Sequence, residues 1–551
     1  MILKRIFFIT TIILVPLSFG YPSLGEASSG AIIASPTKIE ITANPGEEIR
    51  REITVANQSA ELLNVSLRFE NLAAATDPRD GVALAEGTTT PIFPLTPYLS
   101  ATERNFTLPS NSRVAIPIII DLPKEISPGG YYGAAVLSIS SPTTPSIGGA
   151  RVITRLTPLL FLRVTGPTIE TGALLDFNLL GSHFRLATDH PTFYLTYQNT
   201  GTVYLNPYGL IKIKNQITGR EINLPVDPWF VLPGTTRIRE MKTTNNLGNG
   251  WYQAEASLNR GYGSSTDQRI VNFIIITPVI LSLISLVVLI GLFIIIRQLI
   301  VMKRSGRILL MLILMITIIA SATHNAWAIV ASSANYRLQT DSLNFGGFPS
   351  NSTNYKLGDT VGELGTGNLA SSNYSLLSGY QQMFSSSISI TAPTDATLST
   401  IDNNGISSGS VAWTVTTDNS AGYTLSIKAS SNPALVSGSD SFSDYAPSGA
   451  VPDYTWTVAA SASAFGFSPE GADIASRYLN SGSICGTGAT DTADQCWDGF
   501  STTNRTIAQS SAGNTPSGVA TTVKLKAEIG TSKTQPTGSY AATLTVTATP
   551  R

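Results

Sequence analysis

A long apolar stretch in the middle of the chain, between Phe273 and Ala328, constrains the fold most. Its first part, Ile274 to Ile296, is apolar apart from five residues. A helix of roughly 20 apolar residues is long enough to cross a bilayer. We therefore predict a transmembrane helix over residues 273–297, which makes the lipid bilayer a predicted partner.

A second apolar run, Ile308 to Ala320, follows a short segment with four basic residues and no acidic one. Two interpretations stay open for residues 302–328. They form a second transmembrane helix, whose basic flank stays inside by the positive-inside rule. Alternatively they form an internal signal peptide, with a basic start, a short apolar core and a small-residue cleavage motif ending at Ala328.

The N-terminus has the pattern of an export signal. Lys4 and Arg5 precede an apolar stretch, and Ala27 lies at a small-residue cleavage point. We predict a signal peptide over residues 1–27. The predicted localisation is the cell membrane, with a single or double span and both large parts of the protein extracellular.

Short alternating segments separated by turn residues fill both flanks of the apolar stretch. Lys38 to Thr42 alternates, and Asn44-Pro45-Gly46 then turns the chain. Such strands at regular spacing are typical of antiparallel sandwiches. The predicted fold class is all-β: tandem immunoglobulin-like β-sandwich domains with a central transmembrane helix or helix pair. The predicted sandwiches cover residues 31–166, 167–272 and 385–551. Asp77 to Ser100 is rich in proline and is predicted to be a surface loop, where binding usually resides.

An internal repeat occupies residues 329–384. An Asn-Tyr pair recurs at Tyr336, Tyr355 and Tyr374, with 19 residues between successive tyrosines. This period is close to that of small β repeats. We predict short β repeats or a stalk here, with a linker as the alternative.

Composition and charge exclude several classes of function. The chain has 551 residues, a net charge of −1 and only 13% charged residues. Nucleic acid is not an expected partner, because phosphate binding needs clustered Lys and Arg. The two cysteines, Cys485 and Cys496, are predicted to form a disulfide in an oxidising compartment. No metal site is expected, since the three histidines lie far from them in sequence.

Residues of catalytic type are scarce. We find no Ser/His/Asp arrangement and no phosphate-binding loop of the G-x-x-x-x-G-K-[ST] type. The chain is therefore predicted not to be an enzyme and to need no cofactor. Tyr131 and Tyr132 are candidate ligand contacts, because their rings could stack on sugars. Strand alternation would turn one of the two rings into the core.

The N-terminal half resembles the WxL-interacting surface proteins of Gram-positive bacteria. The resemblance covers roughly residues 31–300 and rests on four stretches, which are Ile39 to Val55, Pro128 to Gly133, Asn199 to Gly201 and Val231 to Arg237. It implies a first domain associated with peptidoglycan binding and a second with host or partner binding.

The C-terminal region is similar to WxL-type cell-wall domains and more loosely to fimbrial subunits. Trp413-Thr414-Val415 and the later Trp456 stand where that family has Trp-x-Leu. Valine at position 415 replaces the leucine of that motif and keeps its apolar character. We expect these tryptophans to pack in a core or at an edge.

Together these features predict a membrane-anchored bacterial surface protein. It would bind cell-wall polymer (peptidoglycan) or a surface protein through its β-sandwich domains, in an adhesive or structural role. The alternative is a pilus-chaperone-like assembly factor for exported surface subunits, which would pair an open sheet edge with an exported strand.

Overall fold

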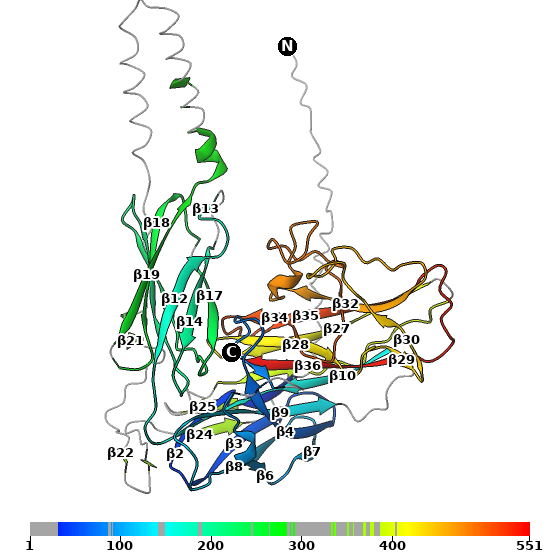
Figure 1. Cartoon of the computed structure of the whole chain (residues 1–551), viewed down its shortest axis with the longest axis horizontal. Helices are drawn as coiled ribbons and strands as arrows, with labels where there is room; N and C mark the ends of the chain where they lie inside the picture. Colours follow the sequence, from blue (N-terminus) through cyan, green and yellow to red (C-terminus); the bar gives the residue numbers. More distant parts are fainter. Residues whose placement is uncertain are drawn as a thin grey trace, which may run out of the picture.

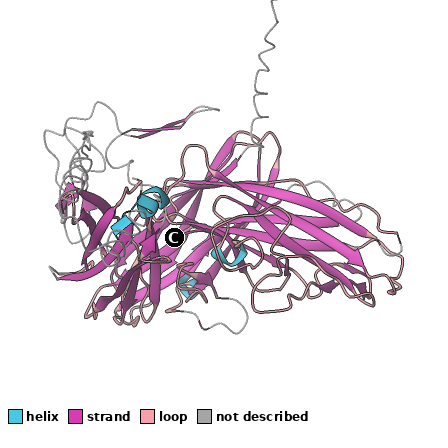
Figure 2. Cartoon of the chain, turned by 90° about the horizontal axis from the view of Figure 1, so that it is seen from above, coloured by secondary structure: helices cyan, strands magenta, loops and turns pink. Residues whose placement is uncertain are grey.

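The structure is a computed structural model. It describes residues 31–283 except 86–89, 91, 141–148, 186–189, 244–245 and 264, and residues 386–551 except 403–404. Between these two parts it describes a few helical residues up to 291 and six short strands from 332 to 378. Strands make up nearly all of the described secondary structure (Figure 2). The all-β, β-sandwich part of the predicted fold class is confirmed, whereas the central transmembrane helix of the same prediction is not.

The first sandwich begins the described chain. Its alternating apolar residues point inward from each strand, as in β3, where Ile53 and Val55 are buried. Its elements are β1 (Ala31–Ser35), β2 (Lys38–Ala43), β3 (Glu48–Asn57), β4 (Leu63–Ala73), β5 (Ala83–Leu84), η1 (Thr96–Tyr98), β6 (Leu99–Ala101), β7 (Asn105–Leu108), β8 (Ser112–Asp121), β9 (Gly129–Ser140), β10 (Gly149–Leu156) and β11 (Leu159–Val164).

The second sandwich has its own core between a three-stranded sheet, β12-β14-β17, and a five-stranded sheet, β13-β19-β18-β15-β16. Its strands are β12 (Gly172–Leu179), β13 (Phe184–Arg185), β14 (Thr192–Asn199), β15 (Tyr208–Asn215), β16 (Glu221–Val226), β17 (Thr236–Lys242), β18 (Gly250–Asn259) and β19 (Thr266–Ile275). We call residues 31–275, which contain both sandwiches, the N-terminal unit.

A small apolar core joins the two sandwiches of the N-terminal unit. Phe230 and Leu232 of the second sandwich pack there against Tyr132 and Phe161 of the first. The ring centroids of Phe161 and Phe230 are 4.9 Å apart, and the two planes are nearly perpendicular. Buried aromatic contacts of this kind fix the two sandwiches against each other.

We call residues 386–551 the C-terminal module. Its disulfide joins Cys485 to Cys496, and both cysteines are buried. Its elements are β26 (Ile388–Thr391), β27 (Ile406–Thr417), β28 (Tyr423–Ala429), β29 (Val436–Ser437), β30 (Asp440–Ser441), β31 (Ser443–Asp444), β32 (Ser463–Gly471), η3 (Ser476–Tyr478), β33 (Asp498–Gly499), β34 (Arg505–Ser510), β35 (Val519–Ile529) and β36 (Ala541–Pro550).

The first sandwich and the C-terminal module share both of their sheets. One sheet runs β31-β32-β35-β27-β26-β1-β3-β8-β6, and the other runs β2-β11-β9-β10-β36-β28-β34. A single hydrophobic core lies between these sheets and includes residues of both parts. In Figure 1 the yellow and red strands of the module continue the blue and cyan sheets, and the C-terminus lies where all three sandwiches meet.

In the region of the Asn-Tyr repeat the structure describes three two-stranded antiparallel ladders, and most of the Asn-Tyr residues themselves lie outside the described residues. These ladders are β20 (Ser332–Ser333) with β21 (Tyr336–Arg337), β22 (Ser350–Asn351) with β23 (Lys356–Leu357), and β24 (Gly367–Ala370) with β25 (Ser375–Ser378).

The predicted transmembrane helix over residues 273–297 is wrong. Within the part of the chain that the structure describes, no helix is long and apolar enough to cross a bilayer. The start of the apolar run forms the end of β19 instead, with Phe273 and Ile275 facing the core of the second sandwich. The predicted localisation as a membrane protein with a single or double span is corrected with it. Residues 302–328 lie outside the described residues.

Candidate functional site

The candidate site is the seam, by which we mean the strand pairs β10–β36 and β1–β26 that join the N-terminal unit to the C-terminal module. β10 pairs in parallel with β36 over eight residues, from Gly149 opposite Ala541 to Leu156 opposite Ala548. On the side of β9, by contrast, only Thr154 to Leu156 are paired. Most of β10 therefore belongs to the sheet of the C-terminal module.

The module also holds the second edge of β10. The N–H of Ala150 donates to the carbonyl of Ala396 at 2.8 Å, and the N–H of Ala396 donates back at 2.9 Å. The next free backbone donor, the N–H of Val152, reaches the Asp395 carboxylate at 2.9 Å. The N–H groups of Ala150 and Val152, which point away from β36, thus both have an acceptor in the module. Backbone groups in a buried strand require such partners.

The second half of the seam is β1, at the N-terminal end of the described chain. It lies between two strands: β3 of the first sandwich and β26 of the module, both antiparallel to it. Ile32 and Ala34 of β1 are fully buried in the shared core. The unit therefore contributes one strand to each of the module's two sheets.

A hydrogen bond crosses the core between the two sheets at the seam. The indole Nε1–H of Trp413, in β27, donates to the hydroxyl of Thr154, in β10, at 3.2 Å. Trp413 is completely buried and Thr154 is 1% exposed. Both polar groups would otherwise lack a partner in an apolar interior.

A loop of the first sandwich clasps the module from outside the seam. We call residues 74–82 the clasp loop; they overlap the start of the predicted surface loop. The Asp80 carboxylate accepts a hydrogen bond from the Thr506 hydroxyl at 2.7 Å, and its carbonyl accepts one from Thr424 at 3.1 Å. Arg79 pairs with Glu240 of the second sandwich at 3.0 Å. Arg551, at the end of β36, donates to the carbonyl of Arg79. The clasp loop, itself part of the first sandwich, thus contacts both the C-terminal module and the second sandwich.

Burial raises the pKa of Asp80 above its ordinary value of 3.8, and the nearby Asp77 raises it further. The hydrogen bond from Thr506 and the charges of Arg551 and Arg79 oppose this shift without cancelling it. Relative to an exposed aspartate, the surroundings of Asp80 therefore disfavour the charged carboxylate.

This shift predicts a pH dependence of stability. A raised folded-state pKa adds stability that is complete below pH 3.8 and is lost as the pH rises through the raised value. We expect the stability of the wild type, measured relative to Asp80→Asn, to increase as the pH is lowered from 7 to 4. The asparagine keeps an acceptor for Thr506 and does not titrate. Chemical denaturation at a series of pH values measures the difference, and a constant difference would contradict the assignment.

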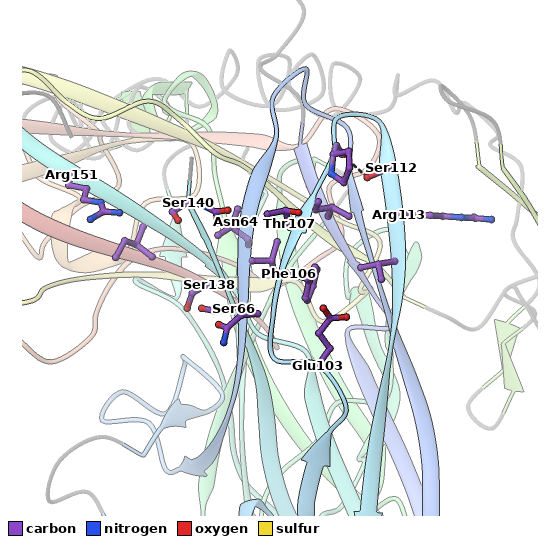
Figure 3. A pocket seen from close by; sticks show the side chains of 17 residues that line it. Asn64, Ser66, Glu103, Phe106, Thr107, Ser112, Arg113, Ser138, Ser140 and Arg151 are labelled. Carbon is purple, nitrogen blue, oxygen red and sulfur yellow. Dashed lines mark hydrogen bonds between the residues drawn. The ribbon is translucent and has the colours of Figure 1, made fainter. Parts of the chain in front are cut away.

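A hollow of about 900 Å³ opens beside the point where β10 leaves β9. Ser138 and Ser140 of β9 line one part of it, and Arg151 and Ile153 of β10 line another. Figure 3 shows Arg151 on one flank and Arg113 of β8 on the other. The β9–β10 ladder ends at Thr154, so the hollow follows from the passage of β10 into the module.

The predicted site residues lie in different places. Tyr132 is fully buried, and its hydroxyl accepts a hydrogen bond from the N–H of Tyr204 at 2.7 Å, within the core that joins the two sandwiches. Tyr131 is half-buried, and its hydroxyl donates to the carbonyl of Ser127. Ligand contact by Tyr131 and peptidoglycan as a partner stay predictions. The predicted cleavage residues Ala27 and Ala328 lie outside the described residues.

Sequence reasoning missed Thr154, Asp395 and Asp80. One signal was available for Thr154: buried positions of β10 alternate with exposed or half-buried ones from Ala150 on, and Thr154 is the hydroxyl residue among buried aliphatic ones. Nothing in the local sequence of Asp395 or Asp80 separates them from ordinary loop carboxylates.

No protein-family model matches the chain, and no curated protein matches it. Among solved structures it is similar to the YadV chaperone, at 12% identity and a TM-score of 0.24, over 44% of this chain and 99% of that one. It is also similar to the CupB2 chaperone of Pseudomonas aeruginosa, at 12% identity and 0.23, over 44% and 99%. The E. coli chaperone DraB matches at 14% identity and 0.23, over 44% and 96%.

Proposed function

We propose that the N-terminal unit is a pilus-chaperone-like assembly factor that holds the C-terminal module by lending it strands. The observation that carries this proposal is the eight-residue pairing of β10 with β36, set against a pairing of only three residues between β10 and β9 of its own sandwich. Adding an extended segment to an open sheet edge is an established mode of recognition.

The module has a physical need for the lent strand. Without β10, the edge of β36 from Ala541 to Ala548 would present unpaired N–H and C=O groups. The buried faces of Leu544 and Val546 would lose cover at the same place. A long, apolar, open edge is a site of aggregation, and covering such an edge is the work of a chaperone.

The N-terminal unit is built to remain folded while it lends a strand. Its second sandwich has a separate core and shares no strand with the seam. Within the first sandwich, β11 pairs with β9 and with β2, so the sheet stays connected beyond the point where β10 departs.

Separate expression of the two parts tests the proposal. We expect residues 386–551 produced alone to aggregate, and the same residues produced together with a separate chain of residues 31–275 to be recovered as a soluble one-to-one complex. The apolar core that the two parts share predicts this dependence. A stable, monomeric C-terminal module in the absence of the N-terminal unit would overturn the proposal.

A further inference from the structure

The inward face of β10 has a distinct chemical pattern. Four alternate residues point into the shared core: Ala150, Val152, Thr154 and Leu156, which are 1%, 7%, 1% and 0% exposed. Three of them are aliphatic, and Thr154 carries the hydroxyl that accepts from Trp413.

A strand with only aliphatic inward residues would not define its own position along β36. A shift by two residues keeps every side chain on the same face, so apolar burial alone distinguishes such registers poorly. In this seam a two-residue shift would bring Val152 or Leu156 to the place of Thr154. The indole N–H of Trp413 would then be buried without an acceptor, which costs free energy.

We infer that Trp413 selects the donor strand through this hydroxyl. The acceptor groove of the C-terminal module takes an extended strand with threonine or serine at the third of four inward positions, and with aliphatic residues at the others. The inference rests on the proposed strand-lending function and specifies the class of strand that fits. Asp395 also accepts from the backbone N–H at the second inward position, a contact that holds the strand but is open to any residue other than proline.

A matched pair of variants of the full chain tests the inference. Thr154→Val keeps the shape of the side chain and removes the acceptor, whereas Thr154→Ser keeps the hydroxyl. The readout is amide hydrogen exchange in residues 541–548 of β36, measured by mass spectrometry. We expect Thr154→Val to accelerate this exchange by roughly tenfold or more, and Thr154→Ser to change it by less than about threefold.

A second comparison separates the hydrogen bond from packing. In a Trp413→Phe background the donor is absent, so Thr154→Val should then accelerate exchange by less than about threefold. If Thr154 only filled space, Thr154→Val would leave the hydrogen exchange of β36 unchanged, because valine packs at least as well in an apolar core. The serine and valine pair decides the question even where Trp413→Phe does not fold.

Two results would overturn the inference. One is an exchange rate of β36 in Thr154→Val equal to that of the wild type. The other is an equal acceleration of this exchange in Thr154→Val and Thr154→Ser. Failure here stays distinct from failure of the proposed function, because the charge variant at Val152 described below disrupts the seam without changing Trp413 or Thr154. If that variant frees the module while Thr154→Val is silent, strand lending stands and hydroxyl selection falls.

Discussion

Val152→Asp is expected to release the C-terminal module from β10 and to leave the second sandwich folded. Val152 is 7% exposed and lies opposite Leu544 in the β10–β36 pair. A carboxylate there would be buried in the shared core without a cation, which costs about 3–5 kcal/mol. Hydrogen exchange resolved by segment measures the result: fast exchange in β36, and unchanged exchange in residues 172–275.

Arg151→Asp is the matched control for this prediction. It places the same side chain on the neighbouring residue, which is exposed and faces away from the core. We expect its stability to stay within about 1 kcal/mol of the wild type. Equal losses from the two variants, or fast exchange spread over the second sandwich, would contradict the account of the seam.

Gly149→Ala is expected to have the second large effect, by blocking the entry of β10 into the groove. A Cβ on Gly149 would lie 2.3 Å from the carbonyl oxygen of Ala396, and the glycine has a φ of +121°. The added atom must displace the segment that holds the outer edge of β10, and the backbone conformation is strained for alanine. We expect a loss of roughly 2–5 kcal/mol in the free energy of unfolding, measured by denaturant titration.

Gly248→Ala provides the comparison. A Cβ at that position meets nothing within 4 Å, and its backbone has no positive φ. The expected change is within about 0.5 kcal/mol. A loss in Gly149→Ala as small as this would show that Ala396 does not confine β10.

The two seam strands, β1 and β10, attach the C-terminal module to the N-terminal unit. In each sheet one strand of the N-terminal unit, β1 or β10, pairs with a strand of the C-terminal module. The hydrophobic core between the two sheets is continuous. The clasp loop adds polar contacts from Asp80 and Arg79 at the outer side. The strands provide apolar burial and backbone pairing, while the clasp ties the module to the second sandwich as well.

Alternation in the sequence predicted strands and their inward faces well. The segment Lys38 to Thr42, for example, lies in β2. The β-sandwich class followed from such segments. Alternation reports which face of a strand is buried and says nothing about the neighbouring strand. The pairing of Gly149 with Ala541, almost four hundred positions along the chain, therefore could not be predicted.

The apolar run shows a second limit of sequence reasoning. Residues 273–275 read equally well as the start of a helix or as the end of a strand, because short apolar segments fit both periods. Partner strands decide between the two. Phe273 pairs with Tyr252 and Ile275 with Gly250, which assigns the segment to β19.

The most direct test of the account is the mass of a deliberately cut chain. A protease site inserted between Phe384 and Ser385, outside the described residues, lets the purified full-length protein be cleaved between its two parts. Sedimentation equilibrium in a non-denaturing buffer then gives the mass of the product. If strands β1 and β10 hold the module, the cut protein keeps the mass of the uncut chain. Two separated species, each with the mass of one fragment, would contradict strand lending.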